Sequence, residues 1–176
     1  TRPDISFRVR NKAGEYRTVE QRSSIAFIDG KPAFLTGILR DVTAYRRTEA
    51  LLQESEIKQR ALFDNANAAI FVADPATGRV LDTNKKGEDL LGMERAEILR
   101  LNNLDMHPQQ KRALYKRLFE RHIKTPGRHH SYEAEVLRKD GTHVPVRIRS
   151  SYLRLGGRLV VQGIFEDISE RKRIDD

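Results

Sequence analysis

The sequence repeats part of itself at a spacing of 126 to 127 residues. The first copy consists of Asn11-Lys12-Ala13-Gly14, Asp29-Gly30 and Gly37–Thr43. The second copy consists of Lys139-Asp140-Gly141, Gly156-Gly157 and Gly163–Ser169. Solenoid repeats are much shorter, about 20 to 50 residues, so this spacing indicates tandem domains. Because the matching parts are the ends of two units, we expect the front of the first unit to be missing.

Each copy predicts three strands joined by tight turns. Ile5, Phe7 and Val9 alternate with polar residues, which is the period of a half-buried strand. The turns contain glycine, which accepts positive φ angles. The later strands of the first copy are expected at Tyr16–Ile28 and at Ala33–Val42, with Pro32 at the edge. The strands of the second copy are expected at Ser131–Arg138, Thr142–Leu153 and Arg158–Ile168.

A helical pattern follows each copy. Ala44–Phe63 contains no Gly or Pro and many helix-forming residues, which predicts a connector helix over residues 44–64. Thr43 and Ser169 are residue types that favour the N-cap position. The apolar residues of the connector form only a loose stripe, so they indicate coiled-coil pairing weakly.

The stretch between the connector and the second set of strands completes one unit. A hairpin is predicted from strands at Ala69–Asp74 and Arg79–Thr83. Next we expect helices at Asn84–Leu91 and Arg95–Leu99, an irregular segment at Asn102–His107 and an amphipathic helix at Gln109–Lys124. This order predicts an α+β fold, in which one five-stranded antiparallel sheet carries helices on one face. The expected domains are a truncated unit (1–43), a helical linker (44–64), a complete unit (65–169) and the start of an output-linking helix (170–176).

Composition narrows the possible chemistry and location. The sequence contains no cysteine, which excludes disulfides, thiolate metal sites and cysteine nucleophiles. No apolar run approaches the length of a membrane span, and no signal peptide is visible. We expect a cytoplasmic fragment without membrane contact, while a membrane anchor elsewhere in the parent protein stays open. The start at Thr1 rather than Met leads us to expect a piece of a longer protein.

The net charge of +8 is concentrated in one stretch. Met106–Ser150 holds 11 Lys or Arg and 4 Asp or Glu. One interpretation is a surface for nucleic acid or another anionic partner. The other is a solvated helix face and sheet surface, and the lack of a recognised nucleic-acid motif favours it.

Other titratable residues have structural explanations. His129 and His130 are adjacent on a strand or at its start, so their side chains point to opposite faces and do not share a metal easily. Glu133 and Glu135 lie on one strand face, where pairing with Arg147 or Arg149 is expected. The sequence contains no phosphate loop, nucleophile elbow or zinc-protease motif, so we expect no catalytic activity in this fragment.

From about Leu62 to Arg173 the sequence resembles the PAS domain of the bacterial sensory-box type. The resemblance rests on Leu62-Phe63-Asp64-Asn65-Ala66, Ile70–Asp74, Val80–Asn84, Leu91-Gly92, Arg138–Thr142 and Gly163–Lys172. Residues 1–43 resemble the last three strands of another PAS domain. The order and spacing of these segments make the resemblance specific.

The resemblance implies a sensory and dimerisation module of a histidine kinase, a diguanylate cyclase or a related regulator with an adjoining output domain. It implies a homodimer formed through flanking helices. It also implies that signals pass through strand-to-helix junctions at Asp41, Thr43, Asp167 and Ser169, although these residues could simply cap a helix. Residues 1–43 would pack on a neighbouring domain or exchange between chains.

The resemblance further implies a small-ligand cavity between sheet and helices. Its expected lining is Phe71, Asn84, Leu91, Leu104, Leu114, Leu118, Ile148 and Phe165, with Asn84 as the polar group. The alternative is that these residues only fill the core. The lack of cysteine excludes covalent flavin photochemistry. Haem is disfavoured because Leu114 occupies the expected histidine position, between His107 and His122, while non-covalent flavin stays open. We expect either no cofactor or an unknown small ligand.

Overall fold

The computed structural model describes residues 5–124 and 130–175. The chain divides into two compact units, the first ending at Gln59 and the second beginning at Arg60. This boundary lies inside the predicted connector. Among the described residues, no helix is long and apolar enough to cross a membrane.

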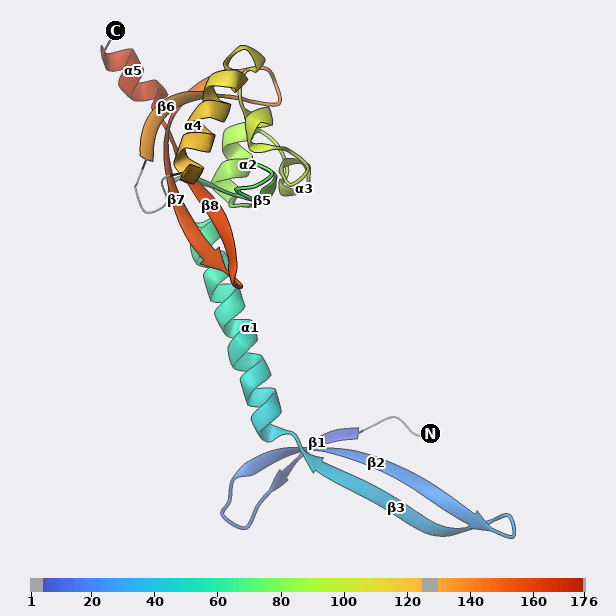
Figure 1. The fold of residues 1–176 in the computed structure, drawn as a ribbon. Coiled ribbons are helices and arrows are strands. Elements are labelled where there is room, and N and C mark those ends of the chain that lie inside the picture. The colour runs from blue at the N-terminus through green and yellow to red at the C-terminus, as the bar shows by residue number, and fades with distance from the viewer. Residues whose placement is uncertain (1–4, 125–129, 176) are drawn as a thin grey trace. The chain divides into compact units, whose positions relative to one another are not determined.

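The first unit contains a three-stranded antiparallel sheet, shown in blue in Figure 1. Its strands are β1 (Ile5–Arg10), β2 (Tyr16–Ile28) and β3 (Lys31–Asp41), in the order β1-β2-β3. The bounds of β2 agree with the prediction. Pro32 lies inside β3 rather than before it, near one end of an edge strand, where the missing N–H disrupts little pairing.

A bulge explains why the repeat spacing changes from 127 to 126 residues. In the first unit the register shifts between Ala26, which pairs with Phe34, and Phe27, which pairs with Pro32. The corresponding strands of the second unit pair without this shift, from Leu153 opposite Val160 to Arg154 opposite Leu159. Ala33 is therefore the one extra residue of the first copy, as in a β-bulge.

The second unit contains a five-stranded sheet in which all neighbours are antiparallel. Its strands are β4 (Ala69–Ala73), β5 (Val80–Thr83), β6 (His130–Leu137), β7 (His143–Leu155) and β8 (Arg158–Asp167). Their order is β5-β4-β8-β7-β6. The β4–β5 hairpin therefore joins the sheet through the pairing of β4 with β8, while β6, β7 and β8 follow one another along the chain. The predicted α+β fold is confirmed.

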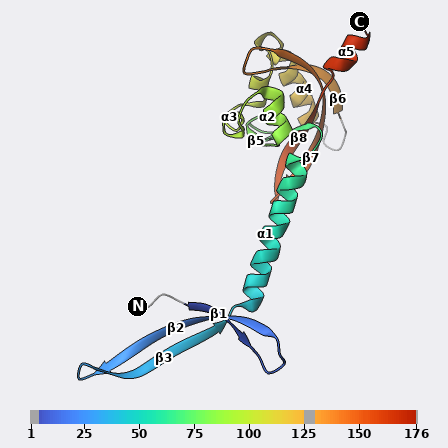
Figure 2. The same ribbon diagram turned by 180° about the vertical axis from the view of Figure 1, so that it is seen from behind.

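The helices of the second unit gather over one side of this sheet, as the two opposite views in Figures 1 and 2 show for α2, α3 and α4. The helical elements of the chain are α1 (Thr43–Asp64), α2 (Lys85–Leu91), α3 (Arg95–Ile98), η1 (Asn103–Met106), η2 (Gln109–Lys111), α4 (Arg112–Lys124) and α5 (Ser169–Asp175).

Two predicted segments between α3 and β6 were wrong in detail. Residues 102–107 are not irregular throughout, because a capping box between Asn102 and Asp105 starts the 3₁₀ helix η1. The long helix does not run regularly from Gln109, because the 3₁₀ turn η2 precedes it and α4 begins at Arg112.

The core lies between the helices and the inner face of the sheet. The helical elements α2, α3, η1 and α4 each contribute a large side chain, and every second residue of β6 and β7 points toward them. The buried cluster is Ala69, Phe71, Val80, Leu91, Ile98, Met106, Tyr115, Ala134, Val136, Val144, Val146, Ile148 and Phe165. Residues of β4, β6, β7 and β8 face η1 and α4 around a small internal space.

Candidate functional site

Asn84 is the most completely bonded side chain near the core. It follows β5, is fully buried and caps α2. Its Oδ1 accepts hydrogen bonds from the backbone N–H groups of Ile70 at 2.9 Å and Gly87 at 3.0 Å. Its Nδ2 donates to the carbonyls of Phe63 at 3.1 Å and Ala68 at 2.9 Å. The side-chain amide of Asn84, which we expected to contact a ligand, is therefore fully hydrogen-bonded within the protein.

An internal cavity of about 40 Å³ lies between the sheet and the helices. Its apolar wall includes Phe71 and Phe165, whose rings meet edge to face with centroids 4.8 Å apart. Its polar side chains are Asn103, His107, Tyr132 and Ser150. A water occupies about 30 Å³ in the liquid, so a ligand larger than a few atoms requires side chains to move.

Three of the predicted lining residues reach this cavity: Phe71, Ile148 and Phe165. Asn84 and Leu91 are fully buried in the core but do not line it, and Leu104 and Leu118 pack against the core while partly exposed. Leu114 is 46% exposed, which contradicts a place in the lining. The reason is the phase of α4, which turns Tyr115, Leu118 and Phe119 inward at helical spacing.

His107 was not predicted as a lining residue, yet it lines the cavity and is only 4% exposed. Its Nδ1 lies 2.7 Å from the carbonyl oxygen of Glu135 on β6. Its ring packs on that of Tyr115, with centroids 4.3 Å apart, and the Tyr115 hydroxyl accepts from the N–H of Glu135 at 3.0 Å. Burial lowers the pKa of His107, so its neutral form is favoured.

Tyr132 supplies a second polar group of the cavity that the sequence did not reveal. Burial raises the pKa of its phenol to about 12, which keeps the hydroxyl protonated at neutral pH. Both His107 and Tyr132 act across the fold, on residues distant in the sequence. Periodicity could place Tyr132 on the inner face of its strand, but no local signal marks His107.

An open groove of about 580 Å³ lies outside the cavity, between the β4–β5 turn, η1 and α4. Asn103 and Phe119 line both the groove and the internal cavity. Phe119 is partly exposed, in contrast to the buried rings of the cavity wall. These two side chains therefore separate the cavity from the surface.

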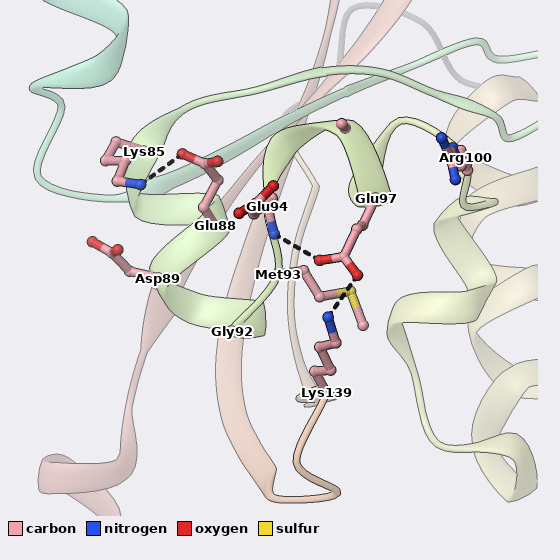
Figure 3. Close-up of a pocket in the computed structure, with 10 residues that line it drawn as sticks. Lys85, Glu88, Asp89, Gly92, Met93, Glu94, Glu97, Arg100 and Lys139 are labelled. Atoms are coloured by element: carbon pink, nitrogen blue, oxygen red, sulfur yellow. Dashed lines mark hydrogen bonds and ion pairs between the residues drawn. The ribbon is translucent and has the colours of Figure 1, made fainter.

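A larger surface hollow, of about 720 Å³, lies beside α2, α3 and the β6–β7 turn (Figure 3). Two of its carboxylates are already engaged within the protein. Glu97 accepts from Lys139 at 2.6 Å and from the N–H of Glu94 at 3.0 Å, and the Lys139 contact above all lowers the pKa of Glu97. Glu88 accepts from the N–H of Arg95 at 2.7 Å, which lowers its pKa, and pairs with Lys85 at 3.1 Å. These two side chains are therefore held as stabilised anions.

The two strand-to-helix junctions share one geometry. The carboxylate of Asp41 accepts from the N–H of Thr43 at 2.9 Å, and that of Asp167 accepts from the N–H of Ser169 at 2.8 Å. The residue between each pair, Val42 or Ile168, is buried. The N–H of Val42 donates to the carbonyl of Thr18, and the N–H of Ile168 donates to the carbonyl of Pro145, each on the neighbouring strand. Hydrogen bonding to Thr43 lowers the pKa of Asp41.

The junctions differ in one hydrogen bond. The hydroxyl of Thr43 accepts from the N–H of Thr18 at 2.8 Å. The matching strand residue of the second unit is Pro145, which has no N–H to donate to Ser169. The first junction therefore has a hydroxyl bond to its sheet that the second junction cannot make at the same position.

The predicted strand-face ion pairs form in part. Arg147 lies 3.8 Å from Glu133, as expected. Glu135 instead pairs with Lys111 at 2.6 Å and His143 at 3.3 Å, and both contacts lower its pKa. His129 and the side chains of His122 and His130 lie outside the described residues. Within the described part of the chain, no group of three or more His, Asp or Glu is placed to hold a metal ion.

Comparison with known proteins identifies the second unit. The family model described as PAS domain matches residues 67–170. The methyl sulfide methyltransferase-associated sensor of Methanosarcina acetivorans is 28% identical over 143 residues, which cover 81% of this chain and 14% of that protein. The chain thus spans a small part of this relative.

Two solved structures extend the comparison. The PAS domain of an HTR-like protein from Haloarcula marismortui superposes with a TM-score of 0.62 at 22% identity, covering 70% of this chain and 99% of that one. A domain of the sensory box sensor histidine kinase/response regulator from Geobacter sulfurreducens gives a TM-score of 0.55 at 25% identity, covering 66% and 96%.

Replacing Asn84 by Asp tests whether its amide holds the core together. The change keeps the shape but removes both donors and points a charge at the carbonyls of Phe63 and Ala68. We expect the free energy of unfolding to fall by about 3 kcal/mol or more, because buried polar groups lose their partners. Urea denaturation measures this effect, with the exposed Asn67→Asp as control. Equal stability of the two variants would contradict the role of Asn84.

His107 should make the stability of the second unit depend on pH. Its pKa is lower in the folded state than the ordinary value of 6.5. The unfolded chain therefore takes up a proton first, and stability is lost as the pH falls from about 7 through the folded-state pKa. Urea midpoints between pH 7 and pH 5 should fall less for His107→Phe than for the unchanged chain. His143→Gln, a change at an exposed histidine, is the control. If the pH dependence of the urea midpoint disappears in this variant and not in His107→Phe, its assignment to His107 is wrong.

Proposed function

Since the chain belongs to the PAS domain family, the sensor domains of signal-transduction proteins, we propose that its second unit senses a small ligand and relays the event through its flanking helices. The observation that carries this proposal is the course of β8. Val161, Gly163 and Phe165 of this strand line the cavity, and two residues after Phe165 the strand ends at Asp167, whose carboxylate caps α5. A ligand that displaces Phe165 therefore acts on the residue that orients the outgoing helix.

The parent protein is proposed to be a histidine kinase or a diguanylate cyclase type regulator with an output domain after α5. The Geobacter neighbour is a domain of a sensor histidine kinase/response regulator, and the Methanosarcina relative is a sensor. The fragment itself is proposed to be non-catalytic and without a resident cofactor. In support of this, the carboxylates of Glu88 and Glu97 in the hollow of about 720 Å³ are engaged in internal pairs.

The first unit is proposed to be the end of a preceding PAS domain. Its strands, junction and buried Val42 repeat those of the second unit. By register, Ile5, Leu35 and Leu39 correspond to residues on the inner face of the second sheet, yet they are 55%, 71% and 63% exposed. This face requires a cover, from helices like those over the second sheet or from a second chain.

A nucleic-acid function is not proposed. Several cations of the basic stretch already pair with groups of the same unit. These pairs are Lys111–Glu135, Arg112–Asp105, Lys139–Glu97, Arg147–Glu133 and Arg149–Glu166. They reduce the charge that a nucleic acid would meet.

Homodimerisation is proposed to occur through α1. Five large apolar side chains of this helix, among them Leu51 and Leu52, are at least 60% exposed, which is costly for a helix without a partner. We expect light scattering to give the mass of two chains, and Leu51→Lys with Leu52→Lys to shift it toward one. Glu54→Lys on the same helix is the control. A dimer that survives the leucine changes but is lost on deletion of residues 1–43 would instead assign the contact to exchanged strands.

Replacing Asp167 by Ala tests the relay. Loss of the acceptor for the N–H of Ser169 should free the first turn of α5, because an N-cap contributes about 1 kcal/mol. Hydrogen exchange of residues 169–175 should become several-fold faster, with β8 unchanged. Asp140→Ala removes a similar bond, to the N–H of Thr142, at a turn away from α5 and serves as control. Equal exchange in α5 for both variants would count against the relay.

A further inference from the structure

One ring nitrogen of the cavity has no partner. The carbonyl of Glu135 can only accept, so Nδ1 of His107 carries the proton that it donates there. The neutral ring then has a bare lone pair on Nε2. Among the described residues, the Nδ1 contact is the only hydrogen bond that the ring makes. The ring is 96% buried, and because Nδ1 points to the edge of β6, Nε2 points away from that strand.

The surroundings of His107 explain what such a lone pair can recognise. The other face of the cavity is formed by Phe71, Ile148 and Phe165, which offer no hydrogen bond. An ionised carboxylate has only acceptors and would meet the Nε2 lone pair with its own. A cation would lose its hydration among aromatic and aliphatic groups without a counter-charge in the lining. A small neutral molecule with an O–H or N–H donor meets neither obstacle, and Asn103, Tyr132 and Ser150 add polar groups to the lining.

We propose that the cavity recognises a compact neutral hydrogen-bond donor with an apolar body, such as a phenol-like alcohol, whose donor bonds to Nε2 of His107. This inference rests on the proposed sensory function and deepens it. The neutral imidazole favoured by burial keeps Nε2 available as an acceptor near neutral pH. The lining then selects by the hydrogen bond to Nε2 and by the shape of its aromatic wall, next to the polar groups of Asn103, Tyr132 and Ser150.

Phe119 controls access to this site. It lines the cavity of about 40 Å³ on one side and the groove of about 580 Å³ on the other. A cavity that accepts a benzene ring measures about 150 Å³, so a ring-sized ligand has to displace a side chain. Phe119 is partly exposed and is the aromatic side chain that lines both spaces, so turning it outward would join them.

The test compares phenol with toluene, which has the same shape but no donor, by calorimetric titration of the chain. Phe119→Ala should bind both probes several-fold more tightly than the unchanged chain, because it opens the cavity. In Phe119→Ala we expect phenol to be preferred over toluene by roughly five- to tenfold, the effect of one buried hydrogen bond. Adding His107→Phe should remove that preference and leave toluene binding in place.

The possible results separate the inference from the function on which it rests. Equal binding of phenol and toluene to Phe119→Ala would overturn the role of His107 while leaving a ligand cavity. Failure of both probes to bind would overturn the cavity itself. If His107→Phe does not fold, ¹⁵N NMR of the unchanged chain decides instead. The Nε2 resonance of His107 should report an unprotonated nitrogen and shift with phenol but not with toluene, and an unmoved resonance refutes the proposal.

Discussion

The four hydrogen bonds of the Asn84 side chain are the constraint on which the second unit depends. They join the end of α1, the start of β4 and the first turn of α2 at one buried point. Gly87 completes this arrangement, because a Cβ there would lie 2.1 Å from the hydroxyl oxygen of Thr83 and 3.1 Å from the ring of Phe71. The close approach of α2 to β4 keeps Phe71 against Phe165 and the cavity small.

The sequence predicted the sheet well because most strands alternate, β4 is a short apolar run and each hairpin turn contains glycine. The repeat also predicted that both units end in the same junction, and the Asp41 and Asp167 contacts bear out its local geometry. The repeat could not explain why the spacing between the two copies changes from 127 to 126 residues, because the bulge at Ala33 depends on the pairing of β2 with β3. The role of these junctions in signalling stays a prediction.

The cavity lining was less predictable for a different physical reason. Leu114 and Tyr115 are adjacent on one amphipathic helix, and which of them faces inward depends on where α4 begins. Two 3₁₀ turns precede that start: η1, which the capping box of Asn102 and Asp105 begins, and η2, which begins after Pro108. His107 was missed because its partner is a backbone carbonyl 28 residues away, which leaves no trace in the local sequence.

Asn84 and His107 show two opposite uses of a buried polar group. All the donors and acceptors of the Asn84 amide are occupied, so this residue stabilises the fold and has nothing left for a ligand. His107 engages one nitrogen with β6, which fixes its tautomer, and leaves the other without a partner in the described structure. An unmet acceptor in an apolar cavity costs free energy that a suitable donor can restore. Because β8 forms the opposite wall and leads directly into α5, the binding event proposed at His107 would press on the strand that leads into the outgoing helix.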